Sequence, residues 1–222
     1  LKTPGGPAPR DGFPVLLALH GFGDDGPRLD ARLTIPDEAP YARLFPDAPF
    51  PVEGKDDAGR PRLGRSWYAY DGDQERFLSA LRFAEGYLRD ALDAAARRAP
   101  VDPRRVVLFG YSQGGYLAAV AAFRDRTRYR ALAGAACRVK TEALGRELIG
   151  AAGYPVLLLH GRADAHTPLD RQEAAVAELR RAGVDVALKV HDGGHGLRRD
   201  AGVEVDAFVR RAFGAAAPES AR

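Results

Sequence analysis

The sequence has 222 residues, of which 45% are hydrophobic and 28% are charged, and its formal net charge is +3. These values are typical of one globular domain with a sizeable core. The arginines are interspersed with acidic residues and no basic stripe carries aromatic side chains, so we expect no nucleic-acid partner. No apolar run approaches the ~18 residues that a membrane-spanning helix requires, so we also expect no membrane span.

A single cysteine, Cys137, rules out an internal disulfide. That fits a reducing compartment, so we expect a cytoplasmic protein in which Cys137 is a small buried hydrophobe. The sequence begins at Leu1 and contains no Met, which predicts a processed chain. A signal peptide removed before Leu1 would leave no trace in the sequence.

The first part of the sequence combines one clear strand with irregular stretches. We predict a single domain over residues 1–222, with loose termini at 1–10 and 214–222. A continuous apolar run at 14–19 predicts a buried parallel strand. Residues 27–73 contain many Pro and Gly residues, so we expect a long loop region there, with a short strand at 41–45.

The rest of the sequence alternates helices and strands. Asp73 is a predicted helix N-cap, and apolar residues at three- and four-residue spacing continue the helix to about Arg98. The next predicted elements are a strand at 105–109, a buried helix at 115–123, a strand at 130–136, a short helix or loop at 141–149, a strand at 155–159, a helix that Thr167 caps and Gly183 ends, a strand nearer the sheet edge at 184–190, and a helix capped by Asp200. This alternation predicts an α/β fold with a mostly parallel central sheet and helices on both faces.

The most informative motif is Gly110-Tyr111-Ser112-Gln113-Gly114, which lies between a predicted strand and a predicted helix. Gly-x-Ser-x-Gly at such a turn is typical of a nucleophile elbow, in which the serine hydroxyl projects from a strained backbone. Gly110 and Gly114 lack the Cβ atoms that would clash in this turn. Ser112 is therefore the predicted nucleophile.

A serine nucleophile needs a base to take its proton and an acid to orient that base. In this fold class the acid follows the serine in sequence and the histidine comes last. We predict Asp164 as the acid, because it stands in the loop after the strand at 155–159. Asp170 is the rival, but its position three residues after Thr167 is that of a helix-capping box.

His195 is the predicted base, because glycines on both sides let the backbone bend its ring toward the elbow. His191 is the rival, at the end of a strand where its ring can point to either face. His191 and His195 also have the spacing of two zinc ligands on a helix, which Asp164 and His166 would complete. The two glycines between the histidines make a helix unfavourable, so we expect no metal.

The negative charge that develops on an attacked carbonyl oxygen requires backbone amides as hydrogen-bond donors. We predict Gln113, directly after the nucleophile, and Phe22, in the loop after the first strand, as these donors. His20 begins that loop at the end of a buried strand. We expect it to hydrogen-bond within the loop and not to act as a base.

Several segments match one family in its own order: the His20-Gly21-Phe22-Gly23-Asp24 loop, Phe45-Pro46-Asp47-Ala48-Pro49, Ser66-Trp67-Tyr68, the elbow with its second glycine, His160-Gly161-x-x-Asp164, and Gly194-His195. With these segments the sequence resembles the carboxylesterase/phospholipase-like branch of the α/β-hydrolase superfamily, which includes acyl-protein thioesterases. The resemblance implies Ser112 as nucleophile, Asp164 as orienting acid and His195 as base and acid.

The resemblance also implies an oxyanion hole of the Phe22 and Gln113 amides in a single-domain α/β-hydrolase fold, without a large lid and without a cofactor. It places Trp67 and Tyr68 at the bound substrate, with Trp67 lining the acyl pocket, although a core position for Trp67 is an open alternative. The sequence departs from the family after the Trp-Tyr pair, where Ala69-Tyr70-Asp71 replaces an immediate Asp. These departures surround the expected pocket, so they concern the substrate.

We therefore predict a serine esterase that hydrolyses a small-molecule carboxylic ester, or a thioester, through an acyl-enzyme on Ser112. Two alternatives stay open. A lysophospholipase or peptidase would use the same three side chains on another substrate, and a non-catalytic binding protein of this fold would not need them.

Overall fold

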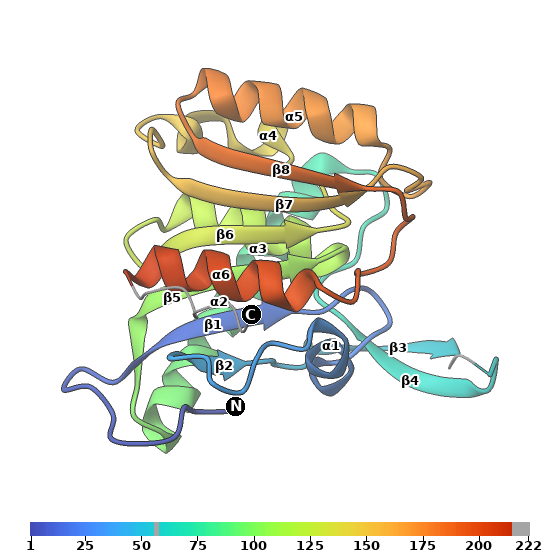
Figure 1. Ribbon diagram of the computed structural model, residues 1–222. Coiled ribbons are helices and arrows are strands. Elements are labelled where there is room, and N and C mark those ends of the chain that lie inside the picture. Colours follow the sequence, from blue (N-terminus) through green and yellow to red (C-terminus); the bar gives the residue numbers. More distant parts are fainter. Residues whose placement is uncertain (56–57, 215–222) are drawn as a thin grey trace.

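The computed structural model describes residues 1–55 and 58–214 (Figure 1). Within these ranges the central sheet has six strands in the order β2-β1-β5-β6-β7-β8, and every neighbouring pair is parallel. The strands are β1 (Phe13–Leu19), β2 (Ala42–Leu44), β5 (Val101–Tyr111), β6 (Tyr129–Ala135), β7 (Pro155–Gly161) and β8 (Asp185–His191). The predicted α/β fold is confirmed, and the strand expected near the sheet edge is the edge strand β8.

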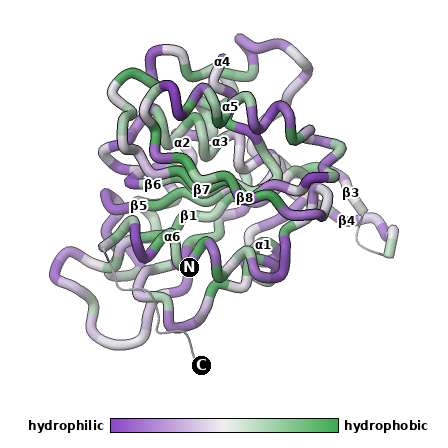
Figure 2. Tube along the Cα trace, turned by 45° about the horizontal axis from the view of Figure 1, so that its top comes forward, coloured by the Kyte–Doolittle hydropathy of each residue, from purple (hydrophilic) through white to green (hydrophobic). Residues whose placement is uncertain are grey.

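Helices cover both faces of the sheet (Figure 1). One face carries α1 (Gly26–Leu33) and α6 (Ala201–Phe213), and the other carries α2 (Gln74–Arg98), α3 (Gln113–Arg124), α4 (Thr141–Leu144), the 3-10 helix η1 (Gly145–Leu148) and α5 (Leu169–Arg181). Leu17 packs on the α2–α3 side and Leu16 on the α1–α6 side, so β1 is buried on both faces. Figure 2 shows the hydrophobic residues concentrated along the strands. This two-sided burial explains why the strands are continuous apolar runs.

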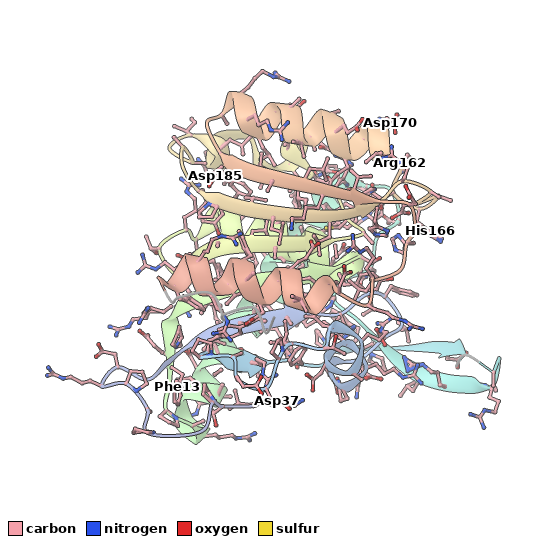
Figure 3. All side chains as sticks on the ribbon, in the orientation of Figure 1. Phe13, Asp37, Arg162, His166, Asp170 and Asp185 are labelled. Carbon is pink, nitrogen blue, oxygen red and sulfur yellow. The ribbon has the colours of Figure 1, made fainter. Side chains whose placement is uncertain are left out.

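Parallel strands bring their carboxyl ends to one edge of the sheet, and functional groups of such folds gather there. Figure 3 shows His166 at the carboxyl ends of the strands, and Asp185, which begins β8, at their amino ends. The loops after β1, β5, β7 and β8 carry Phe22, Ser112, Asp164 and His195 respectively. The topology therefore collects the predicted site residues from four separate parts of the chain.

Residues 27–73 are more regular than the sequence predicts. Asp25 caps α1 by accepting the Arg28 amide, and Pro27 lies in its first turn. The antiparallel strands β3 (Phe50–Lys55) and β4 (Pro61–Ser66) form a hairpin that projects from the molecule (Figure 1). Pro suits the first turn of a helix and the exposed edge of a small sheet, so the prolines did not prevent these elements.

Two predicted boundaries also differ. Lys2 exchanges two backbone hydrogen bonds with Arg43, so the terminus expected to be loose over residues 1–10 is joined to β2. The N-cap of α5 is Pro168, and Asp170 completes no capping box with Thr167. Residues 215–222, which form most of the predicted loose C-terminus, lie outside the described part of the chain. No helix among the described residues is long and apolar enough to cross a membrane.

Candidate active site

Ser112 lies between the end of β5 and the start of α3, with φ 50° and ψ −118°. A positive φ is unfavourable for a residue with a Cβ, so the surrounding packing must hold this turn. A Cβ on Gly110 would lie 2.4 Å from the Gly114 oxygen, and one on Gly114 would lie 2.4 Å from the Leu19 oxygen. Both glycines are therefore required by close backbone contacts, and the strained elbow has the predicted form.

Ser112, His195 and Asp164 form a continuous chain of hydrogen bonds. The Oγ of Ser112 lies 2.8 Å from Nε2 of His195, and Nδ1 of His195 lies 2.8 Å and 3.0 Å from the two Asp164 carboxylate oxygens. Asp164 is buried, and its Oδ1 also accepts the amides of His166 and Thr167 at 2.9 Å. Burial opposes ionisation, but the Thr167 amide and His195 outweigh it and lower the pKa of Asp164. An ionised carboxylate fixes the imidazole so that Nε2 can accept a proton from the serine.

Backbone hydrogen bonds hold the Asp164 loop against the His195 loop. The Arg162 amide donates to the His191 oxygen at 2.7 Å, and the Ala163 amide donates to the Gly193 oxygen at 3.0 Å. From the elbow, the Tyr111 hydroxyl donates to the His195 oxygen at 2.8 Å. Because β7 and β8 are neighbours, the two loops leave the sheet together and Asp164 meets His195.

The rival residues occupy other positions. The Nδ1 atom of His191 accepts the Gly193 amide at 3.0 Å, and the Asp170 carboxylate accepts the Arg171 amide at 2.8 Å on the exposed start of α5 (Figure 3). Among residues 1–55 and 58–214, no group of three or more His, Cys, Asp or Glu side chains is arranged to hold a metal ion.

The amides predicted to form the oxyanion hole belong to Phe22 and Gln113, and both residues line the same cavity as Ser112. Gln113 begins α3, where first-turn amides have no acceptor within the helix. In the Phe22 loop, the next two amides donate to the oxygens of Arg65 and Gly21. Within the described ranges, no acceptor takes the amide of Phe22 or Gln113.

Trp67 is a fully buried core residue and does not line this cavity, whereas Tyr68 does. The structure thus places Trp67 in the core alternative that the sequence left open. His20 is buried with its ring centroid 5.0 Å from that of Trp67, its Nδ1 lies 2.7 Å from the Gly21 oxygen, and its Nε2 accepts the Ala48 amide at 3.0 Å. Burial lowers the pKa of His20, which favours the neutral ring that this acceptor role needs. His20 supports its loop, as the sequence predicts.

The profile of the phospholipase/carboxylesterase family matches residues 10–211. The chain belongs to this family. It is 28% identical over 144 residues to acyl-protein thioesterase 1 of Gibberella zeae, and the aligned region covers 63% of this chain. The same region covers 59% of that relative, so the match spans less than two thirds of the relative's length.

Solved structures share the fold of this phospholipase/carboxylesterase family member. Esterase PE8 is 26% identical, with a TM-score of 0.69, over 96% of this chain and 100% of that chain. The carboxylesterase of Bacillus cereus is 25% identical, with a TM-score of 0.67, over 90% of this chain and 89% of that chain.

In this family member, the cavity at Ser112 has a volume of about 550 Å³. It is joined by an apolar cavity of about 660 Å³, because Phe22, Tyr68, Tyr70 and Gln113 line both. The apolar cavity continues to two aromatic side chains, Phe50 on β3 and Phe83 on α2, whose ring centroids are 5.6 Å apart. We call this second cavity the aromatic groove.

Sequence reasoning missed several residues at the site. Arg28, Arg32 and Arg62 line the cavity that holds Ser112, and His166 places its ring centroid 4.7 Å from that of His195. The arginines carry no motif, and the irregular pattern of 27–73 hid their helix and hairpin. Tyr111 occupies a variable position of the elbow motif, so its hydrogen bond to the His195 loop had no sequence signal.

Proposed function

We propose that the protein is a serine hydrolase that cleaves carboxylic esters or thioesters, with Ser112, His195 and Asp164 as its catalytic triad. The observation that carries the proposal is the unbroken hydrogen-bonded chain from the Ser112 hydroxyl through His195 to the buried Asp164 carboxylate. A non-catalytic binding protein would have no use for a strained serine in hydrogen-bond contact with an oriented imidazole.

The reaction begins when His195 Nε2 takes the proton of Ser112 and Oγ attacks the ester carbonyl carbon. The carbonyl oxygen becomes an oxyanion, which the amides of Phe22 and Gln113 stabilise. When the intermediate collapses, His195 gives its proton to the departing alcohol or thiol and leaves an acyl-enzyme on Ser112. A water molecule then repeats the sequence, with His195 as base, and releases the acid.

The aromatic groove supports a substrate whose acyl group is apolar, with that acyl group lying in the groove beyond the oxyanion hole. The groove shares Phe22 and Gln113 with the cavity at Ser112. Phe50 and Phe83 are 43% and 60% exposed, which leaves their rings accessible to a ligand. Asp24 is the acidic side chain on the wall of the cavity at Ser112, and it is paired with Arg32 and Arg62. A substrate amino terminus would compete with these arginines for Asp24, so a peptide substrate is disfavoured.

A cytoplasmic location remains a prediction, supported by the buried thiol of Cys137.

The first test compares Ser112→Ala with Ser79→Ala, in which an exposed serine of α2 is removed. We expect Ser112→Ala to lower kcat on p-nitrophenyl esters by at least about 10⁴-fold, because the oxyanion hole alone supplies little of the rate. Ser79→Ala should match the parent protein. A serine-reactive phosphonate should label the parent on Ser112 and leave Ser112→Ala unlabelled. Equal turnover by the two alanine variants would refute the proposal.

The second test concerns the aromatic groove. Phe50→Ala and Phe83→Ala should lower kcat/KM for p-nitrophenyl octanoate, and the loss should be smaller for the acetate, whose acyl group is too short to reach the rings. Each ring removed from contact with an acyl chain should cost about 1 kcal/mol or more, which is severalfold in kcat/KM. Equal losses for both esters would show that the acyl chain lies elsewhere.

A further inference from the structure

We propose that Arg28 and Arg32 form a subsite for an anionic group, a carboxylate or a phosphate, on the alcohol or thiol that leaves the substrate. The inference rests on the proposed esterase function and specifies its substrate class. The substrate would combine an apolar acyl group with an anionic leaving group.

The position of Arg32 relative to His195 indicates the leaving-group side of the cavity. The guanidinium carbon of Arg32 lies 5.3 Å from the centroid of the Tyr111 ring, and that ring lies 5.8 Å from the ring of His195. The leaving group must face His195, because His195 returns the proton to it. The aromatic groove opens instead at the oxyanion-hole residues. The two halves of an ester therefore meet walls of different chemistry.

Helix α1 presents both arginines to the cavity because they are four residues apart and share one face of the helix. Leu29 and Leu33, also four residues apart, form the buried face that anchors α1 on the sheet. The guanidinium groups are thus fixed to a packed element while their side chains remain 43% and 47% exposed. A ligand can reach them without disturbing the core.

The charges around the subsite leave a positive excess. The guanidinium groups of Arg28, Arg32 and Arg62 line the cavity, and the carboxylates paired with them are those of Asp24, which also lines it, and Asp25. Arg32 is paired with Asp24, and Asp25 lies 3.3 Å from Arg62 and 3.7 Å from Arg28. Arg62 is nearly buried and also donates to the Gly23 oxygen.

The remaining titratable side chains that line the cavity are tyrosines, His166 and His195, so among the described residues Asp24 is the one carboxylate on its wall. The planar fork of a guanidinium binds carboxylate or phosphate oxygens in pairs, which suits a substrate anion better than a chloride. Arg28 and Arg32 therefore offer donors to a ligand, while Arg62 holds the loop beside them.

The test uses two esters with the same acyl group and the same type of leaving group, 2-nitrophenyl octanoate and 3-nitro-4-octanoyloxybenzoate. Only the second releases a phenol that carries a carboxylate. The quantity compared between proteins is the ratio of kcat/KM for the anionic ester to that for the neutral ester, so intrinsic reactivity cancels. The variants are Arg28→Gln, Arg32→Gln and their combination, and Arg97→Gln, at the far end of α2, is the control.

We expect the ratio to fall by about tenfold or more in the double variant, because charge-assisted hydrogen bonds to the substrate are lost. Arg97→Gln should leave it unchanged, and about 0.5 M NaCl should lower it in the parent protein. A ratio that stays the same in the double variant would overturn the subsite for a carboxylate and leave phosphate as the anion to be tested. Absence of Ser112-dependent turnover of the neutral ester would instead overturn the proposed function, and with it the subsite.

A second pair of substrates distinguishes the source of the anion. 1-Octanoylglycerol and 1-octanoylglycerol 3-phosphate are compared by the octanoate they release, with the same variants. A larger loss for the phosphate pair than for the carboxylate pair assigns the subsite to phosphate, and the reverse assigns it to carboxylate. Unchanged ratios in both pairs reject an anion subsite altogether.

Discussion

The indole nitrogen of Trp67 donates a hydrogen bond to the backbone oxygen of His20 at 2.8 Å. His20 precedes the loop that carries Phe22. The backbone amide of Trp67 donates in turn to the side-chain oxygen of Gln113 at 3.0 Å. One buried residue therefore joins the two segments whose amides form the proposed oxyanion hole. This connection gives Trp67 a role at the site although it does not line the cavity at Ser112.

Trp67→Phe should lower kcat more than it raises KM. The phenyl ring fills most of the site but leaves the buried His20 oxygen without its donor, which costs about 1–3 kcal/mol of stability. The Phe22 loop then loses its fixed position relative to Ser112, and the interaction lost is made mainly in the transition state. Steady-state kinetics and urea unfolding would measure the two effects. A large loss of stability with an unchanged kcat would contradict the role assigned to Trp67.

Two helical glycines should respond in opposite ways to the same substitution. A Cβ on Gly115, in α3, would lie 2.4 Å from the Cys137 sulfur, whereas the nearest atom to a Cβ on Gly86, in α2, is the tip of Arg89 at 3.8 Å. Gly115→Ala should destabilise the protein by about 1–3 kcal/mol through overpacking. Gly86→Ala should stabilise it by about 0.5–1 kcal/mol, because alanine is the better helix former.

Thermal and urea unfolding of both variants would measure these changes. The parent protein is the reference for each, and the thiol of Cys137 provides an internal check, because displacement of its side chain should increase its reaction with a thiol reagent in Gly115→Ala only. Burial raises the pKa of this thiol to about 12 in the parent protein, so it should react slowly there. Destabilisation by Gly86→Ala, or stabilisation by Gly115→Ala, would contradict the tight contact assigned to Gly115 and the open space assigned to Gly86.

Local sequence patterns predicted the sheet and the three residues of the hydrogen-bonded chain because each of the three lies in a loop that follows a predicted strand. The Gly-x-Ser-x-Gly turn, Asp164 and His195 all follow β-strands, and parallel pairing brings such loops together without further information. The hairpin β3–β4 and helix α1 were missed because their Pro and Gly residues occur in loops as well as in hairpins and at helix starts, so the sequence pattern favoured a loop. The grouping of Arg28 and Arg32 with Arg62 could not be predicted, because it depends on where the hairpin packs. Trp67 shows the same limit: neighbours in sequence, Trp67 and Tyr68, have different environments.

The pKa of Asp164 leads to a prediction about stability and pH. Burial opposes its ionisation, but the amides and His195 outweigh burial, so the folded-state pKa lies below the ordinary value of about 4. Between the two values the unfolded state binds more protons than the folded state, so this contribution to stability rises with pH. It is complete above the ordinary value and is lost as the pH falls through the folded-state pKa.

Asp164→Asn should therefore differ most from the parent protein near neutral pH, and the difference in unfolding free energy should shrink as the pH falls below about 4. Urea unfolding at a series of pH values would measure it. Asp170→Asn, which removes an exposed carboxylate from the same segment, is the matched control and should show a weaker dependence on pH. A difference for Asp164→Asn that grows as the solution becomes more acidic would contradict a folded-state pKa of Asp164 below its ordinary value.

The hairpin β3–β4 should influence catalysis through a backbone contact, although it lies at the edge of the molecule (Figure 1). The amide of Gly23 donates to the Arg65 oxygen and the amide of Arg65 donates to the Asp24 oxygen, both at 2.9 Å, so β4 pairs with the loop that carries Phe22. A Cβ on Gly64 would lie 2.2 Å from the Gly23 oxygen, whereas one on Gly54 of β3 meets its nearest atom at 3.9 Å.

Gly64→Ala should push the Phe22 loop away from β4 and lower kcat by about tenfold to a hundredfold, up to the effect of losing one oxyanion-hole donor. KM should change less, because the groove keeps its Phe50 and Phe83 walls. Gly54→Ala adds the same methyl group to the other strand of the hairpin and should leave kcat as it is. The informative quantity is kcat of each variant beside its urea unfolding midpoint. If both variants kept full activity, or lost it equally, the contact between β4 and the Phe22 loop would have no part in aligning the proposed oxyanion hole.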